Sequence, residues 1–306
     1  MDKIKLLLLC PFVLVISSSS CPLRYTCGDE PYACTGMFYT MPYENPIKYD
    51  APNDIILYSN GMLVKKETDG QETYNLNQIC NKDTITDFVL YDRYIRDRNN
   101  IPDSITINLD GFALVLSPQA CCKMAWFDNV LLEFGSVGPD SIILVNAVSV
   151  DVNYLQQIYI LDYGDSSLKV FDKYGNFISK WNNIGRPKLI KIFSEKVWIL
   201  NELDGSIKVY DFHGVYQNSI ENGGQWTDIT AFKLNADNSV WISDFNGRRL
   251  SLFSDEETIC EFHGDFCYMD AIFSFGRIVS LEGLYYVTAI DIEKNLIIDF
   301  AEANYY

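Results

Sequence analysis

The sequence predicts an all-β chain that forms a β-propeller, with six four-stranded blades favoured, and three observations support this fold. A pair of short apolar strands recurs along the chain. Glycines follow the second strand of several copies at a constant distance. Twenty Tyr and eighteen Phe lie among branched aliphatic residues, which favours strands because such side chains pack well on a pleated surface.

The repeat is clearest in the second half of the chain. Three copies align without a gap and begin at Ile158, Val197 and Val240, which are 39 and 43 residues apart. In each of them a second apolar strand begins ten residues later. Weaker copies begin at Ile55, Ala113 and Leu284, which gives six copies in all. A repeat of this length indicates a stacked or radial array of similar units.

Each copy contains enough strands for one propeller blade. Gly70, Gly175 and Gly214 lie seven residues after the second strand begins, where a hairpin turn needs a positive φ. A third strand then follows, and another apolar strand precedes each copy, as at 189–193. Four strands in about 40–45 residues is the period of a blade. The aromatic column of the repeat is therefore expected to be core, and its members are Tyr159, Trp198, Trp241 and Tyr285.

The stretch from Ile158 to Ile178 resembles the NHL-type six-bladed propellers of exported bacterial lipoproteins. The resemblance is strong over 155–262, fair over 105–154 and 263–306, and weak before 105. The first two copies begin 58 residues apart, at 55 and 113, which is longer than one blade. This spacing predicts an insertion around 80–100 or a small separate module within 46–104. Five blades, or a four-bladed array behind a distinct domain, are the alternatives.

The first twenty residues predict a signal peptide. Lys3 and Lys5 precede an apolar run over 6–16, which is too short to span a bilayer as a helix. Small residues then lead to Cys21, as in bacterial lipoprotein signals, although Ser18 stands where Leu is usual. We expect lipidation of Cys21, a tether over 21–45 that resembles those of Bacteroidetes-type lipoproteins, and a propeller over 46–306. The chain is thus expected at the cell envelope or outer membrane, with simple secretion as the alternative.

Seven cysteines remain once Cys10 in the signal and Cys21 are set aside. An exported protein can form disulfides, and the two pairs that are close in sequence are candidates: Cys27 with Cys34, and Cys260 with Cys267. The other three are Cys80, Cys121 and Cys122. Connectivity does not follow from one sequence. No metal site is predicted, because C-x-x-C spacing does not occur and the chain has two His.

The net charge of −17 argues against nucleic acid as a partner, because phosphate binding needs clustered Lys and Arg. Charged residues make up 21% of the chain, and its basic residues are interleaved with acidic ones, as at 92–98. An acidic surface favours solubility and can attract cations or basic partners.

Propellers usually bind on the face formed by the turns between second and third strands and by the connections between blades. Candidate ligand-binding residues on this face are Trp181, Arg186, Trp226, Asp228, Asp244 and Arg248. For the two tryptophans the alternative, which we favour, is buried packing. Every copy also has a hydrogen-bonding side chain at its fifth position: Ser59, Ser117, Asp162, Asn201, Asp244 and Thr288. This column is either a ring of ligands or, as we favour, a set of caps for backbone N–H groups.

No group of residues predicts a named reaction, so no catalytic residue is assigned. Lactonase-like and lyase-like propellers hold a central metal through carboxylates, and the candidates near blade ends are Glu133, Glu202, Asp228, Asp244 and Asp270. His213 and His263 are expected in turns. We expect a non-enzymatic, envelope-anchored propeller without a cofactor that binds a protein or glycan. The alternative is a metal-dependent hydrolase or lyase that acts in the central channel, for which Ca²⁺ is the candidate ion.

Overall fold

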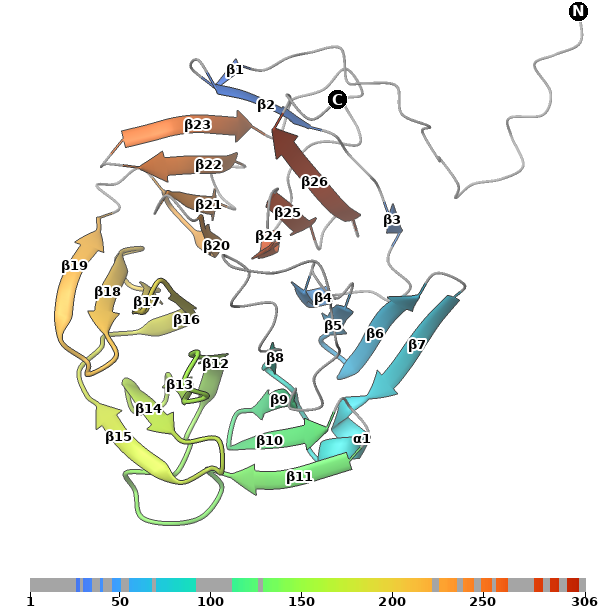
Figure 1. Ribbon diagram of the computed structural model, residues 1–306, viewed down its shortest axis with the longest axis vertical. Coiled ribbons are helices and arrows are strands. Elements are labelled where there is room, and N and C mark those ends of the chain that lie inside the picture. Colours follow the sequence, from blue (N-terminus) through green and yellow to red (C-terminus); the bar gives the residue numbers. More distant parts are fainter. Residues whose placement is uncertain are drawn as a thin grey trace, which may run out of the picture.

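The protein is described from a computed structural model of the chain (Figure 1). The described residues are 26–27, 30–34, 39–40, 46–50, 55–67, 70–91, 112–125, 129–221, 226–235, 239–244, 249–254, 257–263, 278–282, 287–291 and 296–302. Side chains within 26–34, 39–40 and 254–302 lie outside the description.

Five four-stranded antiparallel blades form most of the molecule, and each is built from consecutive strands. Blade 1 contains β4 (Pro46–Asp50), β5 (Ile55–Tyr58), β6 (Met62–Glu67) and β7 (Gly70–Asn75). Blade 2 contains β8 (Asp87–Tyr91), β9 (Phe112–Ser117), β10 (Ala120–Ala125) and β11 (Asn129–Phe134). Blade 3 contains β12 (Ala147–Val152), β13 (Ile158–Asp162), β14 (Ser167–Phe171) and β15 (Phe177–Trp181).

The remaining two blades have the same order. Blade 4 contains β16 (Pro187–Phe193), β17 (Lys196–Asn201), β18 (Ile207–Asp211) and β19 (Tyr216–Ile220). Blade 5 contains β20 (Ile229–Leu234), β21 (Val240–Asp244), β22 (Arg249–Ser254) and β23 (Glu257–His263). The repeat copies predicted from 113 to 240 each mark the second strand of a blade, because this strand is buried between two neighbours and is the most apolar.

The prediction of six four-stranded blades is wrong, because the structure has five. The copy predicted at Leu284 belongs instead to a six-stranded sheet that combines both ends of the chain. It contains β24 (Ile278–Glu282), β25 (Val287–Asp291) and β26 (Leu296–Glu302) together with β1 (Thr26–Cys27), β2 (Glu30–Cys34) and β3 (Tyr39–Thr40). Figure 1 shows β1 and β2 lying beside β26. Strands β1, β2 and β3 fall within 21–45, the segment that the sequence predicts to be a tether.

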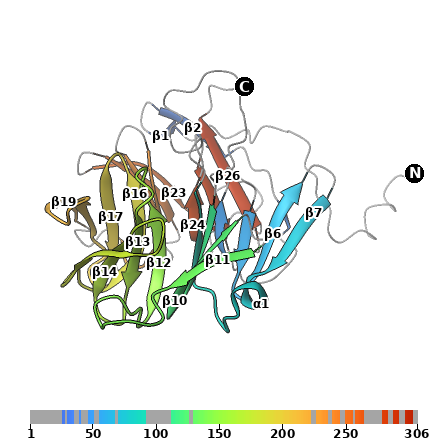
Figure 2. The ribbon, with the colours of Figure 1, turned by 60° about the horizontal axis from the view of Figure 1, so that its bottom comes forward.

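The innermost strands are arranged in a ring. Contacts run from β4 to β8, β12, β16, β20 and β24, and β24 returns to β4. Figures 1 and 2 show the sheets radiating from this centre, with the fourth strand of each blade outermost. The sheet made of both chain ends therefore lies between blades 5 and 1 and closes the ring.

A short helix and a long connection account for the wide spacing between the first two copies. Helix α1 (Leu76–Cys80) follows β7 directly and is the one helix in the described part of the chain. The Asn75 side chain caps its start by accepting from the Gln78 N–H, and Asn81 ends it in the left-handed conformation. The rest of the predicted insertion, 92–100, lies outside the described residues.

Aromatic pairs join neighbouring blades at a repeated position. Each pair contains the residue thirteen positions after a copy begins, at 158, 197 or 240, and an aromatic residue from near the end of the preceding blade. The pairs are Phe171 with Phe134, Tyr210 with Trp181, and Phe253 with Trp226, at ring-centre distances of 4.9, 5.9 and 5.2 Å. Such pairs stabilise the interface beyond the area they bury. The predicted core column is buried at Tyr159, Trp198 and Trp241, while Tyr285 lies outside the described residues.

The turns before the outermost strands of blades 3 and 4 have the same construction. Asp172 accepts the backbone N–H groups of two turn residues, and Asp211 does likewise. Gly175 and Gly214 adopt φ of 79° and 82°, as predicted. Gly70 was expected to behave in the same way, but its φ is not positive because it begins β7 instead of occupying the turn.

Candidate functional site

The turns of the propeller define two faces. One face is formed by the turns between second and third strands and by the connections between blades, and we call it the loop face. Turns between first and second strands, and between third and fourth strands, form the opposite face, because neighbouring strands of a blade are antiparallel. The predicted ligand-binding residues belong to the loop face.

The polar column at the ends of the second strands caps backbone. Asp162 is fully buried and accepts the N–H groups of Val145, Asn146 and Gly164 at 2.8, 2.8 and 3.1 Å. Asp244 is also buried and accepts the N–H groups of Thr227 and Asp228. Each carboxylate thus fixes the connection that enters its own blade. These contacts support capping over a ring of ligands, and they occupy Asp244, which was a candidate ligand-binding residue.

The same column continues into a buried ion cluster in blade 3. Lys169 has no exposed surface, and its Nζ lies 2.5 Å from Asp162 Oδ2 and 2.8 Å from Asp165 Oδ2. Lys180 Nζ reaches the same Asp165 oxygen at 2.8 Å, and Ser167 donates to the other oxygen. A buried charge costs several kcal/mol unless it is paired, so these partners explain how Lys169 is tolerated. The cluster anchors the turn at 163–166.

That turn presents the first part of an exposed group that we call the loop-face cluster: Tyr163, Arg186, Glu202 and Leu203. Arg186 donates to the Tyr163 hydroxyl from both Nε, at 2.9 Å, and Nη2. The hydroxyl donates to Glu202 Oε2 at 3.2 Å, and the guanidinium lies 3.2 Å from the same oxygen. The Arg186 carbonyl accepts the Glu202 N–H at 2.8 Å, which joins the two connections.

The loop-face cluster is ordered and still exposed. The Arg186 and Glu202 side chains keep 53% and 45% of their surface, and Leu203 is 72% exposed. The Arg186 guanidinium also lies over the Tyr163 ring, 5.5 Å from its centre. A cation held over an aromatic ring beside an exposed leucine resembles the anchors of protein interfaces, which are enriched in Tyr and Arg.

The sequence identified Arg186 but not its ring partner. Tyr163 and Glu202 directly follow the column residues Asp162 and Asn201 in the repeat. The residue after each second strand is therefore the signal that would have found them.

The other candidates on this face have different surroundings. Trp226 is buried against Phe253, and Trp181 packs on Tyr210, so both belong to the aromatic pairs between blades. Their prediction as ligand-binding residues is not supported by these positions. Asp228 is partly exposed and lies 3.5 Å from Lys188 Nζ.

Three of the carboxylates considered for a central metal have separate partners. Glu133 pairs with Lys82 at 2.8 Å near α1, while Glu202 belongs to the loop-face cluster and Asp244 caps backbone. The Lys82 ammonium lowers the pKa of Glu133, more strongly than burial raises it. Within the described residues, no three His, Cys, Asp or Glu side chains come together where they could hold a metal ion.

Side chains from one blade bind the inner edge of the next around the ring. Asp87 on β8 accepts the Val150 N–H at 2.9 Å, and Asp151 on β12 accepts the Ile192 N–H at 2.6 Å. Lys188 on β16 donates to the Ile229 carbonyl at 2.8 Å. Because the edge of an innermost strand has no strand partner, these bonds satisfy backbone groups that would otherwise lack one. The charged residues at this edge thus have a structural role.

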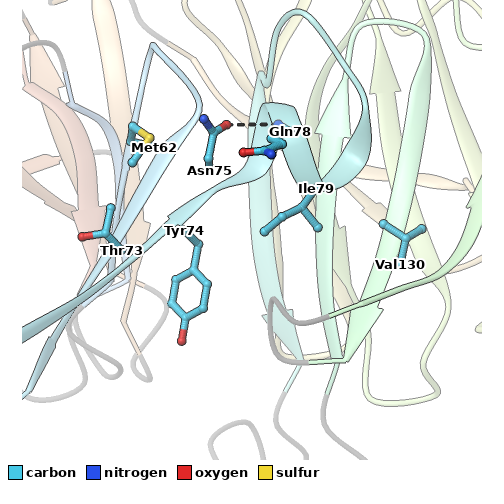
Figure 3. Close-up of a pocket in the computed structure, with 7 residues that line it drawn as sticks. All are labelled: Met62, Thr73, Tyr74, Asn75, Gln78, Ile79 and Val130. Carbon is cyan, nitrogen blue, oxygen red and sulfur yellow. Dashed lines mark hydrogen bonds between the residues drawn. The ribbon is translucent and has the colours of Figure 1, made fainter.

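A groove of about 680 Å³ lies on the outer side of the molecule beside α1. Its lining residues are Met62, Thr73, Tyr74, Asn75, Gln78, Ile79 and Val130. Figure 3 shows Gln78 and Ile79 on the helix, Tyr74 on β7 and Val130 on β11, with the capping bond of Asn75 to Gln78. The groove arises because the inserted helix separates the outer strands of blades 1 and 2.

Several predicted residues lie outside the description. Cys21, Arg248, Cys267 and Asp270 are outside the described residues. Cys27 and Cys34 lie in β1 and β2, and Cys260 lies in β23, but their side chains are not described. His263 ends β23 instead of lying in a turn, whereas His213 lies in the exposed turn before β19. No helix among the described residues is long and apolar enough to cross a bilayer.

Comparison with known proteins supports the fold. Similar solved structures include virginiamycin B lyase from Staphylococcus aureus, at a TM-score of 0.55 and 12% identity, with 87% of each chain covered. The WD40 β-propeller domain of Doa1 has a TM-score of 0.57 and 12% identity over 89% of this chain and 81% of that one. The Cps50 (Swd1) β-propeller domain of Myceliophteria thermophila has a TM-score of 0.57 and 10% identity over 89% and 99%.

No protein-family model and no curated protein sequence matches the chain. Identities of 10–12% establish the β-propeller fold and leave ligand and activity open, because propellers support many unrelated functions.

Proposed function

We propose that this chain is a non-enzymatic, envelope-anchored β-propeller that binds a protein partner through the loop face of blades 3 and 4. The observation that carries the proposal is the loop-face cluster. Its Arg186 and Tyr163 side chains are held in one arrangement before any partner arrives, beside an exposed Leu203. Prearranged side chains lose less conformational entropy on binding, which favours affinity.

A protein partner fits this surface better than a small molecule. Small-molecule sites are concave and bury most of the ligand, whereas Leu203 and Arg186 protrude with more than half of their surface exposed. The second possible ligand is a glycan that stacks on the Tyr163 ring, and the experiment described next distinguishes it from a protein. The alternative is a metal-dependent hydrolase or lyase. Metal analysis and an activity assay on the same purified protein test this alternative.

Affinity capture from envelope extracts of the native host tests the proposal. We expect a partner that wild-type protein retains and that Arg186→Ala and Leu203→Ser lose by at least about tenfold, as for interface anchors. Leu155→Ser is the matched control, since Leu155 is also an exposed leucine (57%) but lies in a turn on the opposite face. Equal capture by all four proteins would contradict the proposal. Loss of binding after glycosidase treatment of the extract would identify a glycan.

Anchoring needs a separate measurement. Intact-mass spectrometry of full-length protein from bacterial membranes should show cleavage before Cys21 and added acyl groups. An unlipidated chain cut near Ser20 would indicate a secreted protein and would leave the loop-face proposal unaffected.

A further inference from the structure

Two cysteines and a methionine, Cys80, Cys122 and Met124, pack in one core cluster between α1 and blade 2. Cys80 ends α1, and its Sγ lies 3.8 Å from the Met124 Sδ on β10. Cys122 lies two residues before Met124 on the same strand, so the two side chains point to the same face of β10. Cys80 and Cys122 are 4% and 1% exposed and belong to one core cluster. Both cysteines therefore pack in the same buried, apolar cluster, and both are free thiols in this structure.

The neighbouring Cys121 is directed elsewhere. Successive side chains of a strand point to opposite faces, and Cys121 accordingly packs in a different core cluster, with Leu116 and Val150. Cys121 and Cys122 are equally buried. The strand thus distinguishes two adjacent cysteines, and one of them faces Cys80.

We propose that Cys80 and Cys122 form a disulfide bond when the protein meets a small-molecule disulfide such as oxidised glutathione. In the first step a protein thiolate attacks one sulfur of the oxidant, which forms a mixed disulfide and releases one thiolate. The second protein thiolate then attacks the mixed disulfide and releases the other. Two protein thiols are oxidised to one disulfide, the oxidant is reduced to two thiols, and two protons move from the protein to the released thiolates.

The surroundings of the two thiols shift their pKa values in opposite directions. The hydrogen bond from Cys80 lowers the pKa of Cys122, more strongly than burial raises it. The same hydrogen bond, together with burial, raises the pKa of Cys80.

The helix that carries Cys80 allows local access. Helix α1 has five residues, and a helix this short is not stable alone in water. Its outer residues Gln78 and Ile79 line the groove of Figure 3. Opening of this one turn would expose Cys80 and uncover Cys122 without unfolding a blade. The bond, once formed, ties the connection between blades 1 and 2 to the third strand of blade 2.

The test is to refold reduced full-length protein in a glutathione redox buffer, alkylate the free thiols after denaturation, and map disulfide-linked peptides by mass spectrometry. We expect a Cys80–Cys122 linked peptide, and a Tm higher by roughly 5 °C or more than in the reduced protein. Alkylation of both Cys80 and Cys122 in wild-type protein would overturn the proposal, and so would a link from Cys80 to Cys121.

Variants assign the effect to this pair. In Cys121→Ala the linked peptide and the Tm difference between oxidised and reduced protein should persist. In Cys80→Ala and in Cys122→Ala, the contribution of the Cys80–Cys122 bond to the Tm difference between oxidised and reduced protein should disappear. Far-ultraviolet circular dichroism confirms that each variant folds. If a variant does not fold, peptide mapping of the wild-type protein still decides the question.

Discussion

Substitution of Lys169 by Met is the most direct test of the buried ion cluster in blade 3. Lys169 and Asp162 have no exposed side-chain surface and lie 2.5 Å apart. Met keeps most of the apolar stem but removes the ammonium, so the Asp162 carboxylate retains only backbone N–H donors, from Val145, Asn146 and Gly164. Removing one partner of a buried pair costs about 3–5 kcal/mol of unfolding free energy.

Lys180→Met is the matched control. Lys180 contacts Asp165 at 2.8 Å, but both side chains are 22% exposed. A partly exposed pair contributes under about 1 kcal/mol. The two lysines lie on neighbouring strands of one blade and share one carboxylate. A difference between the two variants in unfolding free energy therefore reports the burial of Lys169 and not the type of residue replaced.

Equilibrium unfolding in urea, followed by tryptophan fluorescence, measures both variants. We expect Lys169→Met to lower the midpoint strongly and Lys180→Met to change it little, with similar slopes. Adding Asp162→Asn to Lys169→Met should restore part of the loss, because the uncompensated charge is then removed. A Lys169→Met variant as stable as Lys180→Met would refute the assignment of Lys169 as an essential buried partner.

Three further predictions concern blade packing and pH. Trp226→Ala should lower the unfolding free energy by about 3–5 kcal/mol, because it leaves a cavity beside Phe253; thermal unfolding measures this. Gly214→Ala should cost about 1–3 kcal/mol in the same assay, since φ is +82° and the added Cβ would lie 2.8 Å from the Trp181 ring. Burial raises the pKa of Asp165, but hydrogen bonds from two lysines and a serine bring it below its ordinary value. Asp165 therefore stabilises the folded state at pH values above the ordinary carboxyl pKa, and this stabilisation is lost as the pH falls through the lowered pKa. The Asp165→Asn variant should consequently lose less unfolding free energy on acidification, as measured by urea titrations at pH 3–6.

The repeat identified the blades because the second strand of each is buried on both sides. From 113 to 240 the predicted copies mark second strands, with starts within a residue of β9, β13, β17 and β21. In the sheet that closes the ring, the copy at Leu284 predicted the neighbouring strands β25 and β26. The pairing of Tyr32 with Glu302 was not predicted, since it joins distant segments that share no repeat. Local periodicity contains no information about such a pair.

The candidate site was predicted less completely. Arg186 was identified, but Trp226, which was also a candidate ligand-binding residue, is 3% exposed and packs between blades. Its partner Phe253 is in the next blade, 27 residues later, so the residues of one copy do not show which side chain packs on Trp226. Side-chain direction near the end of a blade depends on the neighbouring blade, which a pattern within one blade does not describe.

The closing sheet also affects how the protein folds during synthesis. Strand β26 pairs with β2, so β2 leaves the ribosome long before the strand that completes its sheet. Blades 1 to 5 consist of consecutive strands and can form as they emerge. Until β26 arrives, the edge of β2 has no partner within this sheet, and exposed strand edges promote association between chains. Premature termination before 296 would thus leave an open, association-prone ring, and the time between synthesis of β2 and β26 is the interval in which a chaperone would be most useful.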